Sequence, residues 1–181
     1  LQEALGQRIQ EATWMSAATK AQAKDKLDNF IVKIGYPDKW RDYSGLQIDD
    51  KLSLYANMQN INEFLLQDEL NRKVNKPVDK MEWGMTPQTV NAYYNPTTNE
   101  ICFPAGILQY PFFDPKADEA FNYGAIGVVI GHEMTHGFDD QGAQFDKNGN
   151  LRNWWTEQDK KNFEQRTQRM VKTFDAVEVL P

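Results

Sequence analysis

The chain has 181 residues, of which 40% are hydrophobic and 12% aromatic, enough for one domain with a buried core. Its net charge of -6 and the lack of any basic run exclude nucleic acid as an expected partner. No apolar run approaches the roughly 20 residues that span a bilayer, and the single cysteine, Cys102, cannot form a disulfide within the chain.

The N-terminal segment predicts two helices and a strand. Residues 1–11 form the first candidate helix, and Ser16 is a typical N-cap that opens a second helix over 16–29. Residues 30–34 are rich in β-branched side chains and are followed by the turn residues Gly35 and Pro37, so they predict a strand.

The longest predicted helix covers residues 50–75. Leu54, Met58, Ile61 and Leu65 recur on one side of it at helical spacing. We expect this stripe to pack in the core, with a groove for a partner helix as the alternative interpretation.

The remaining elements predict a small sheet and two more helices. Segments 89–94 and 100–104 flank turn residues and predict a β-hairpin. Asp118 opens a helix expected to reach about residue 140, a tight turn follows at 148–149, and a capping box opens a last helix over 156–174. The expected fold class is α+β, mostly helical with a small antiparallel sheet. We expect residues 1–78 to be a helical N-terminal part and 79–181 the core of the same compact unit.

The only two histidines, His132 and His136, lie four residues apart, and Glu133 directly follows the first. Positions i and i+4 of a helix share one face, so both imidazoles can bind one metal ion. This H-E-x-x-H pattern is typical of zinc peptidases, and its chance occurrence in a chain of this length is below about 1%. Because zinc lowers the pKa of a bound water to roughly 7, Glu133 can accept a proton from it, and the pattern predicts peptide hydrolysis.

The residues before the motif favour a metal over two solvent-facing histidines. Residues 123–130 are too apolar for a surface helix, which predicts a buried one. Polar side chains at the end of a buried helix need partners, because burying an unpaired polar group is costly. A zinc ion supplies that partner; histidines with other structural partners are the alternative.

A third zinc ligand is needed, because catalytic zinc sites use three protein ligands and an open fourth position. Gly142 stands where one known continuation of the motif has its third histidine, so we expect a carboxylate from a separate helix. The candidates within the chain are Glu157, Asp159, Glu164, Asp175 and Glu178. Charged residues on such a helix usually face solvent. Since the chain starts at Leu1, not at methionine, and stops at Pro181, we expect it to be part of a longer protein with the third ligand beyond Pro181.

Several blocks, in order, resemble the catalytic region of neprilysin-like zinc metallopeptidases, a family that includes neprilysin, endothelin-converting enzymes and bacterial oligopeptidases. The resemblance is strongest over about residues 80–170. The blocks are V-N-A-Y-Y (90–94), F-P-A-G-I-L-Q (103–109), P-F-F (111–113), N-Y-G (122–124), V-I-G-H-E-M-T-H-G-F-D-D (129–140) and W-W (154–155). The resemblance implies a zincin-like (thermolysin-like) fold and a metalloendopeptidase that cleaves short peptides.

The resemblance also implies roles for the matching residues. His132 and His136 bind one Zn²⁺, and Glu133 is the general base that later passes the proton to the leaving amine. Asp139 hydrogen-bonds a ligand imidazole and fixes its tautomer.

A further set of matching residues implies where the peptide substrate lies. Asn91 and Ala92 match a segment that binds the substrate backbone as an added strand, although a plain hairpin strand is the alternative. Ile107, Phe112 and Val129 match an apolar pocket for a hydrophobic residue after the scissile bond, with ordinary core packing as the alternative.

The family's Glu-Asn-x-x-Asp motif, which carries the third ligand, does not occur before Pro181. We therefore expect this chain to be a partial catalytic core that binds zinc weakly or not at all and is inactive by itself. There are two alternatives: a non-catalytic module that keeps the motif, and another His₂Glu peptidase such as an aminopeptidase. The resemblance implies an extracytoplasmic location, periplasmic or at the cell surface; the sequence does not predict the oligomeric state.

Overall fold

The computed structural model describes residues 1–178, so the last three residues of the expected core segment lie outside the described residues. The chain divides into two compact units, Leu1–Tyr36 with Met85–Pro181 (unit 1) and Pro37–Gly84 (unit 2). The division predicted from the sequence is at residues 78/79. The N-terminal residues belong with the metal motif because their strand pairs with the hairpin.

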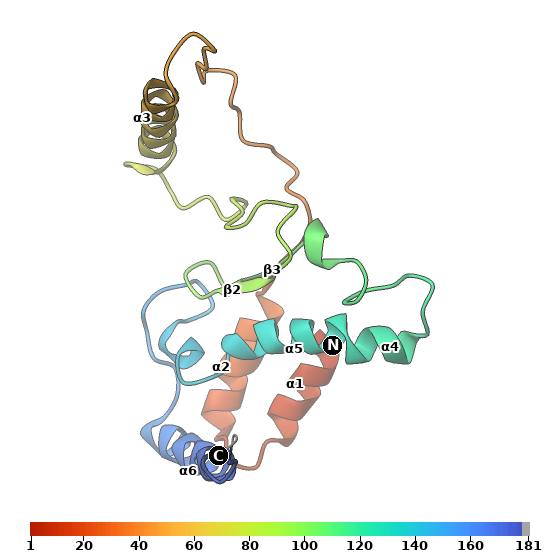
Figure 1. The fold of residues 1–181 in the computed structure, drawn as a ribbon. Helices are drawn as coiled ribbons and strands as arrows, with labels where there is room; N and C mark the ends of the chain where they lie inside the picture. The colour runs from red at the N-terminus through yellow and green to blue at the C-terminus, as the bar shows by residue number, and fades with distance from the viewer. Residues whose placement is uncertain (179–181) are drawn as a thin grey trace. The chain divides into compact units, whose positions relative to one another are not determined.

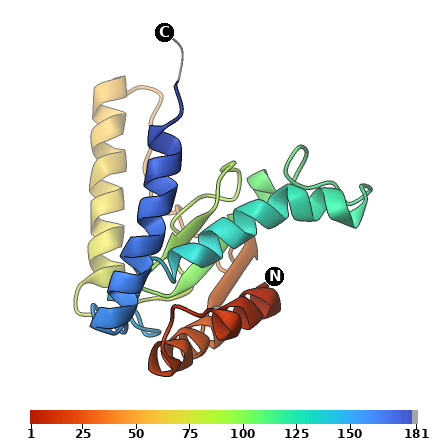
Figure 2. The ribbon, with the colours of Figure 1, turned by 90° about the horizontal axis from the view of Figure 1, so that it is seen from below.

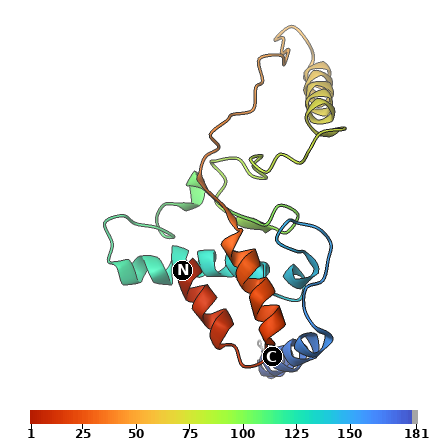
Figure 3. The same ribbon diagram turned by 180° about the vertical axis from the view of Figure 1, so that it is seen from behind.

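Two antiparallel helices open unit 1, α1 (Gln2–Glu11) and α2 (Ala17–Asp28), and they lie side by side in Figures 1 and 3. Both match their predicted ranges. The Ser16 hydroxyl caps α2 by accepting a hydrogen bond from the backbone N–H of Thr19, at 3.4 Å.

A three-stranded sheet follows, with strands β1 (Ile31–Gly35), β2 (Tyr93–Asn95) and β3 (Glu100–Pro104) in the order β1-β3-β2. The predicted hairpin is confirmed, since β2 and β3 are antiparallel, although β2 is shorter than predicted. The expected small antiparallel sheet is thus confirmed for the hairpin alone, because β1 pairs with β3 in parallel and makes the sheet mixed. A short turn dictates the direction of a hairpin, whereas the long connection from β1 permits either direction.

The core of unit 1 forms around β3, all of whose residues are buried. Side chains from the first two helices, the sheet and the metal-motif helix share one buried cluster; its members are Ile9, Met15, Ala23, Leu27, Ala92, Ile101, Phe103, Ile107, Ile126, Met134 and Phe138. This cluster holds the motif helix against the sheet.

The metal motif lies on a helix that is interrupted where one continuous helix was predicted. α4 (Glu119–Gly124) ends at Ala125, whose backbone angles of φ -103° and ψ -94° are not helical, and α5 (Ile126–His136) begins directly after it. α5 contacts β2 and runs along the sheet in Figure 2. It ends at His136 rather than near residue 140, because the chain turns at Gly137.

Short turns and a long helix complete unit 1. Two 3-10 turns, η1 (Ala105–Ile107) and η2 (Gly142–Gln144), flank the α4–α5 segment. The predicted tight turn is present, with Gly149 at φ +84°. α6 (Glu157–Asp175) starts at the predicted capping position, where the Thr156 hydroxyl accepts from the backbone N–H of Asp159 at 3.1 Å.

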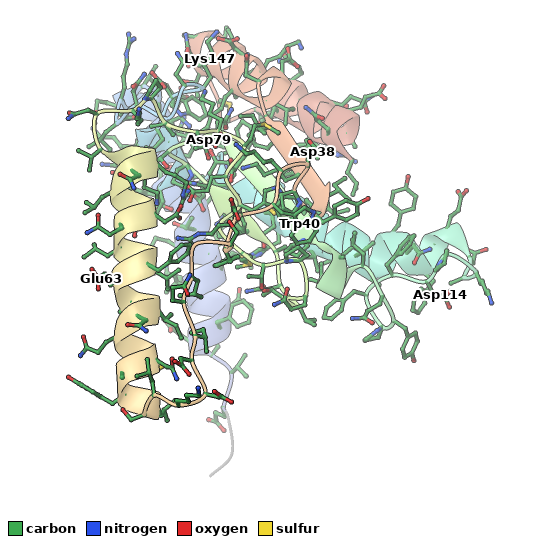
Figure 4. All side chains as sticks on the ribbon, turned by 90° about the horizontal axis from the view of Figure 1, so that it is seen from above. Asp38, Trp40, Glu63, Asp79, Asp114 and Lys147 are labelled. Atoms are coloured by element: carbon green, nitrogen blue, oxygen red, sulfur yellow. The ribbon has the colours of Figure 1, made fainter. Side chains whose placement is uncertain are left out.

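Unit 2 contains one helix, α3 (Leu54–Lys73), with Glu63, labelled in Figure 4, midway along it. The prediction that its apolar stripe packs in the core is wrong, because no residue of α3 is buried: Leu54 is 79% and Met58 46% exposed. Within the described part of unit 2, only loop residues lie against this helix. None of the helices described in residues 1–178 combines the length and apolar character needed to cross a membrane.

Candidate metal centre

The last two turns of α5 present both histidines to the same side. The Nε2 atoms of His132 and His136 lie 3.0 Å apart, and the ring centroids are 4.5 Å apart. Both side chains are exposed. Ile126 of α5 is buried in the core, and Val129 and Ile130 pack against the core cluster, which fixes the helix. Val128 is 63% exposed, so the helix is not buried on all sides as its apolar sequence predicts, and the two rings meet at a solvent-accessible surface.

Glu133 lies between these histidines in sequence and is buried, with 7% of its surface exposed. One ligand atom from each of His132, Glu133 and His136 lies within 4.8 Å of the others. Among residues 1–178, these three form the one group of histidine, cysteine and acidic side chains close enough to hold a metal ion. The predicted motif geometry is therefore present.

The two imidazoles suit a zinc ion. Zinc–nitrogen bonds of about 2.0–2.1 Å in a tetrahedral site place two ligand nitrogens roughly 3.3 Å apart. The Nε2 atoms of His132 and His136 are 3.0 Å apart before any adjustment. Both rings direct the same kind of nitrogen to one point, which is what shared coordination requires.

Asp139 occupies the position from which a carboxylate can orient His136. Its Oδ2 lies 3.4 Å from Nδ1 of His136, while its Oδ1 accepts hydrogen bonds from the backbone N–H groups of Gln141 (3.0 Å) and Gly142 (2.7 Å). A proton held on Nδ1 leaves Nε2 as the free electron-pair donor. The role expected for Asp139 is consistent with these contacts.

Gly142 makes this arrangement possible by packing directly on the end of α5. A Cβ atom at this position would lie 2.1 Å from the carbonyl oxygen of His136 and 2.4 Å from the carbonyl carbon of Gly137. Only a glycine fits there without displacement of the helix end.

A buried lysine outside the predicted site lies beneath the same loop. Lys26 of α2 is 1% exposed, and its ammonium group donates to the carbonyl oxygens of Gly142 and Phe145, both at 2.7 Å. Burial lowers the pKa of Lys26 to about 8, although the negative charges of Asp139 and Asp146 raise it.

The downstream carboxylates proposed as a third ligand do not join the histidines. Asp159 is buried where α2 meets α6, and its carboxylate accepts from the backbone and hydroxyl of Ser16 and from the hydroxyls of Thr19 and Thr156. The other candidates are exposed: Glu157, Glu164, Asp175 and Glu178. None of the five belongs to the metal-binding group found among the described residues.

The two residues predicted to bind the substrate backbone lie immediately before β2, not within a strand. Ala92 is buried, whereas Asn91 is exposed. They lead into an end strand of the sheet, which is also the strand that α5 contacts. The structure thus places this segment at a sheet edge beside the motif helix.

The three residues predicted to form an apolar pocket differ in exposure. Ile107 is 3% exposed and belongs to the core cluster. Phe112 and Val129 are half-buried and pack against that cluster from outside. The backbone N–H of Ile126 donates to the carbonyl of Phe112 at 2.8 Å, which ties the Phe112 loop to the start of α5.

A small mixed sheet that supports a helix with this H-E-x-x-H cluster defines an α+β protein with a candidate metal centre. Two family models described as peptidase family M13 match residues 91–180 and residues 1–37. The chain belongs to peptidase family M13, the neprilysin-like family that the sequence blocks resemble.

Individual relatives agree with this assignment. The chain is 44% identical to an endothelin-converting enzyme homolog of Locusta migratoria, over 94% of this chain and 24% of the relative. It is also 44% identical to a neutral endopeptidase of Lactobacillus helveticus, over 97% of this chain and 27% of the relative. The chain thus spans about a quarter of the length of these relatives.

Solved structures are similar over nearly the whole chain. A crystal structure of the Mycobacterium tuberculosis zinc metalloprotease Zmp1 in complex with inhibitor is 54% identical, with a TM-score of 0.91, over 98% of this chain and 27% of that one. PepO from Lactobacillus rhamnosis is 37% identical, with a TM-score of 0.89, over 98% of this chain and 28% of that one.

Proposed function

We propose that the protein is a zinc-dependent metalloendopeptidase that hydrolyses short peptides. One observation carries the proposal. The Nε2 atoms of His132 and His136 lie 3.0 Å apart on one face of α5, and the Glu133 carboxylate lies within 4.8 Å of them. Membership of peptidase family M13 supports it, as do relatives named as endopeptidases and zinc metalloproteases. The zincin-like fold expected from the family is part of the same proposal.

Each residue of the centre has a distinct task in this proposal. His132 and His136 hold the ion, which when bound supplies Lewis-acid chemistry that makes water acidic near neutral pH. Glu133 accepts a proton from the attacking water as the water oxygen bonds to the carbonyl carbon of the peptide. As the carbon–nitrogen bond breaks, Glu133 passes that proton to the leaving amine. Asp139 holds the Nδ1 proton of His136 throughout.

The third protein ligand comes from a carboxylate outside the described residues. Apart from Glu133, to which we assign proton transfer, no acidic side chain of the described residues belongs to the group around the histidines. The described part of the chain therefore supplies two imidazoles and no completing ligand. Residues 1–181 alone therefore bind zinc weakly and do not hydrolyse peptides.

The substrate lies along the edge of the sheet. Asn91 and Ala92 bind its backbone as an added strand beside α5, and this orientation brings the scissile carbonyl to the histidines. Phe112 and Val129, with Ile107 behind them, favour a hydrophobic side chain after the scissile bond. We propose an extracytoplasmic location from the family resemblance, which cell fractionation tests.

Zinc titration by calorimetry tests the metal centre. The intact protein binds one zinc ion per chain, His132→Ala abolishes this binding, and the matched control Thr135→Ala, between the two histidines, keeps it. Binding that survives in His132→Ala would contradict the proposal. Zinc binding without cleavage of any internally quenched peptide would instead support a non-catalytic module, and removal of single N-terminal residues would support an aminopeptidase.

A further inference from the structure

The buried face of α2 carries a charge where a hydrophobic side chain is expected. Its buried residues are Thr19, Ala23, Lys26 and Leu27, which recur at helical spacing. A buried ammonium group is unfavourable unless acceptors surround it. The partners of Lys26 therefore indicate what its charge does in the fold.

Lys26 is held by the loop that follows the metal-motif helix. Besides its two carbonyl acceptors, Gly142 and Phe145, the ammonium group lies 5.7 Å from the ring centroid of Tyr94 and 5.5 Å from that of Trp154. Nε1 of Trp154 donates to the same two carbonyls, at 3.3 and 3.0 Å. Two donors from distant segments thus hold the loop over 142–145 in place.

The anchored residue Gly142 connects Lys26 with the metal centre. Its carbonyl oxygen faces Lys26, whereas its N–H donates to Oδ1 of Asp139 at 2.7 Å. The other carboxylate oxygen of Asp139 faces Nδ1 of His136 at 3.4 Å. The positive charge of Lys26 also attracts the negative charge of Asp139. A contiguous path of contacts therefore runs from α2 to the ligand imidazole.

We propose that Lys26 is a positioning residue for the metal centre: through Gly142 and Asp139 it fixes the orientation of the His136 imidazole. The proposal rests on the proposed function of His136 as a metal ligand. A lysine that merely anchored the loop would stabilise the fold equally well but would leave His136 and its metal affinity unaffected.

The test compares Lys26→Met with Lys24→Met in the intact protein. Lys24 is a matched control, because it lies on the same helix but is exposed and pairs with Asp28 on the surface. Zinc affinity is measured by chelator competition, and the ligand geometry by the visible absorption of the cobalt(II)-substituted protein. We expect Lys26→Met to weaken zinc binding about tenfold and to change the cobalt spectrum, and Lys24→Met to leave both within about twofold.

A double-mutant cycle with Asp139→Asn distinguishes a path of contacts from general destabilisation. If Lys26 acts through Asp139, adding Lys26→Met to Asp139→Asn weakens zinc binding by less than about twofold further. If the two substitutions instead weaken zinc binding independently, so that their fold-changes multiply, the proposal is overturned. So would a Lys26→Met protein with a lower melting temperature but unchanged zinc affinity and cobalt spectrum.

A second variant and a metal-free measurement cover the remaining outcomes. Trp154→Phe removes the indole donor to the same carbonyls but keeps an aromatic ring; if Lys26→Met does not fold, this variant must weaken zinc binding in the same direction. The nitrogen chemical shifts of the His136 ring, measured by NMR without metal, must change in Lys26→Met or Trp154→Phe and not in Lys24→Met. Unchanged chemical shifts in these variants would overturn the proposal that Lys26 orients His136. A wild-type protein that binds no zinc would instead overturn the proposed function alone.

Discussion

Glu133 and the two histidines next to it occupy different environments on the same helix turn. His132 and His136 are exposed, whereas Glu133 is buried at 7% exposure. Exposed imidazoles can receive an ion and a substrate, while a buried carboxylate is held in one place and is less solvated. This difference matches the division between ligands and general base that we propose.

Replacing Glu133 separates these two roles. Glu133→Gln keeps the side-chain shape but cannot accept a proton, so we expect peptidase activity of the intact protein to fall by about 10³-fold while zinc affinity stays within about twofold. Glu119→Gln, an exposed substitution on α4, is the control and leaves both unchanged. Activity assays and chelator competition on the same preparations measure the two effects. A parallel loss of zinc would show that Glu133 is a ligand, contrary to the proposal.

The proximity of the two histidines, Glu133 and Asp139 could be predicted because all four lie within eight residues, and a helix and the turn after it bring residues at this spacing together. Lys26 and Gly142 could not. Gly142 is 116 residues from its partner Lys26, and only the packing of α2 beneath the loop brings them together. The available signal was weak: a lysine at a buried position of the pattern formed by Thr19, Ala23 and Leu27.

At the scale of elements, the start of α6 is tied to the start of α2 by one carboxylate. Asp159 is 2% exposed and its Oδ2 accepts from the hydroxyls of Ser16 (2.6 Å), Thr19 (2.6 Å) and Thr156 (2.7 Å). Aromatic residues near the two capping residues also contact each other, since the ring centroids of Trp14 and Trp155 are 5.4 Å apart. One buried carboxylate therefore joins the N-cap residues of two helices that are distant in sequence.

Removing this carboxylate destabilises the fold without touching the metal centre. Asp159→Ala leaves several buried hydroxyl and N–H donors without their acceptor, so we expect a loss of about 3 kcal/mol in the free energy of unfolding. Glu164→Ala, at an exposed position of the same helix, is expected to stay within about 0.5 kcal/mol of wild type. Urea denaturation followed by circular dichroism measures both. Equal stabilities of the two variants would contradict this role of Asp159.

The same joint gives folding stability a defined pH dependence. Burial alone would raise the pKa of Asp159, but hydrogen bonds from Ser16, Thr19 and Thr156 outweigh it and hold the pKa below its usual value. A carboxyl whose pKa is lower in the folded state contributes stability that is complete above its unfolded pKa of about 3.9. That stability is lost as the pH falls through the folded value. Asp159→Ala should therefore show a smaller loss of stability below pH about 4 than wild type.

At the scale of the whole molecule, the two units differ in how much they bury. Unit 1 surrounds a fully buried strand, β3, whereas the one helix of unit 2 has no buried residue. Loop contacts and ion pairs support α3, such as those of Asp68 with Arg41 and Arg72, at 22–35% side-chain exposure. Ion pairs this exposed contribute little to stability.

We therefore expect α3 to open separately from unit 1. Hydrogen exchange followed by mass spectrometry should show amides over 54–73 exchanging many times faster than those of β3 and α2, with little dependence on denaturant. The reason is that opening α3 exposes little apolar surface. The control is the exchange of α2, which should follow global unfolding. Equal protection of α3 and α2 would show that the protein opens as one cooperative unit.

The sequence by itself determined the elements whose signals are local. These are the caps at Ser16 and Thr156, the hairpin, and the helix that places His132 and His136 on one face, because turn chemistry and helical periodicity act over a few residues. Only the tertiary structure decided the parallel pairing of β1 with β3, the burial of Asp159 and Lys26, and the exposure of Leu54. Each of these features depends on which distant segment packs or pairs with the residue, and the periodicity of the sequence does not specify that segment.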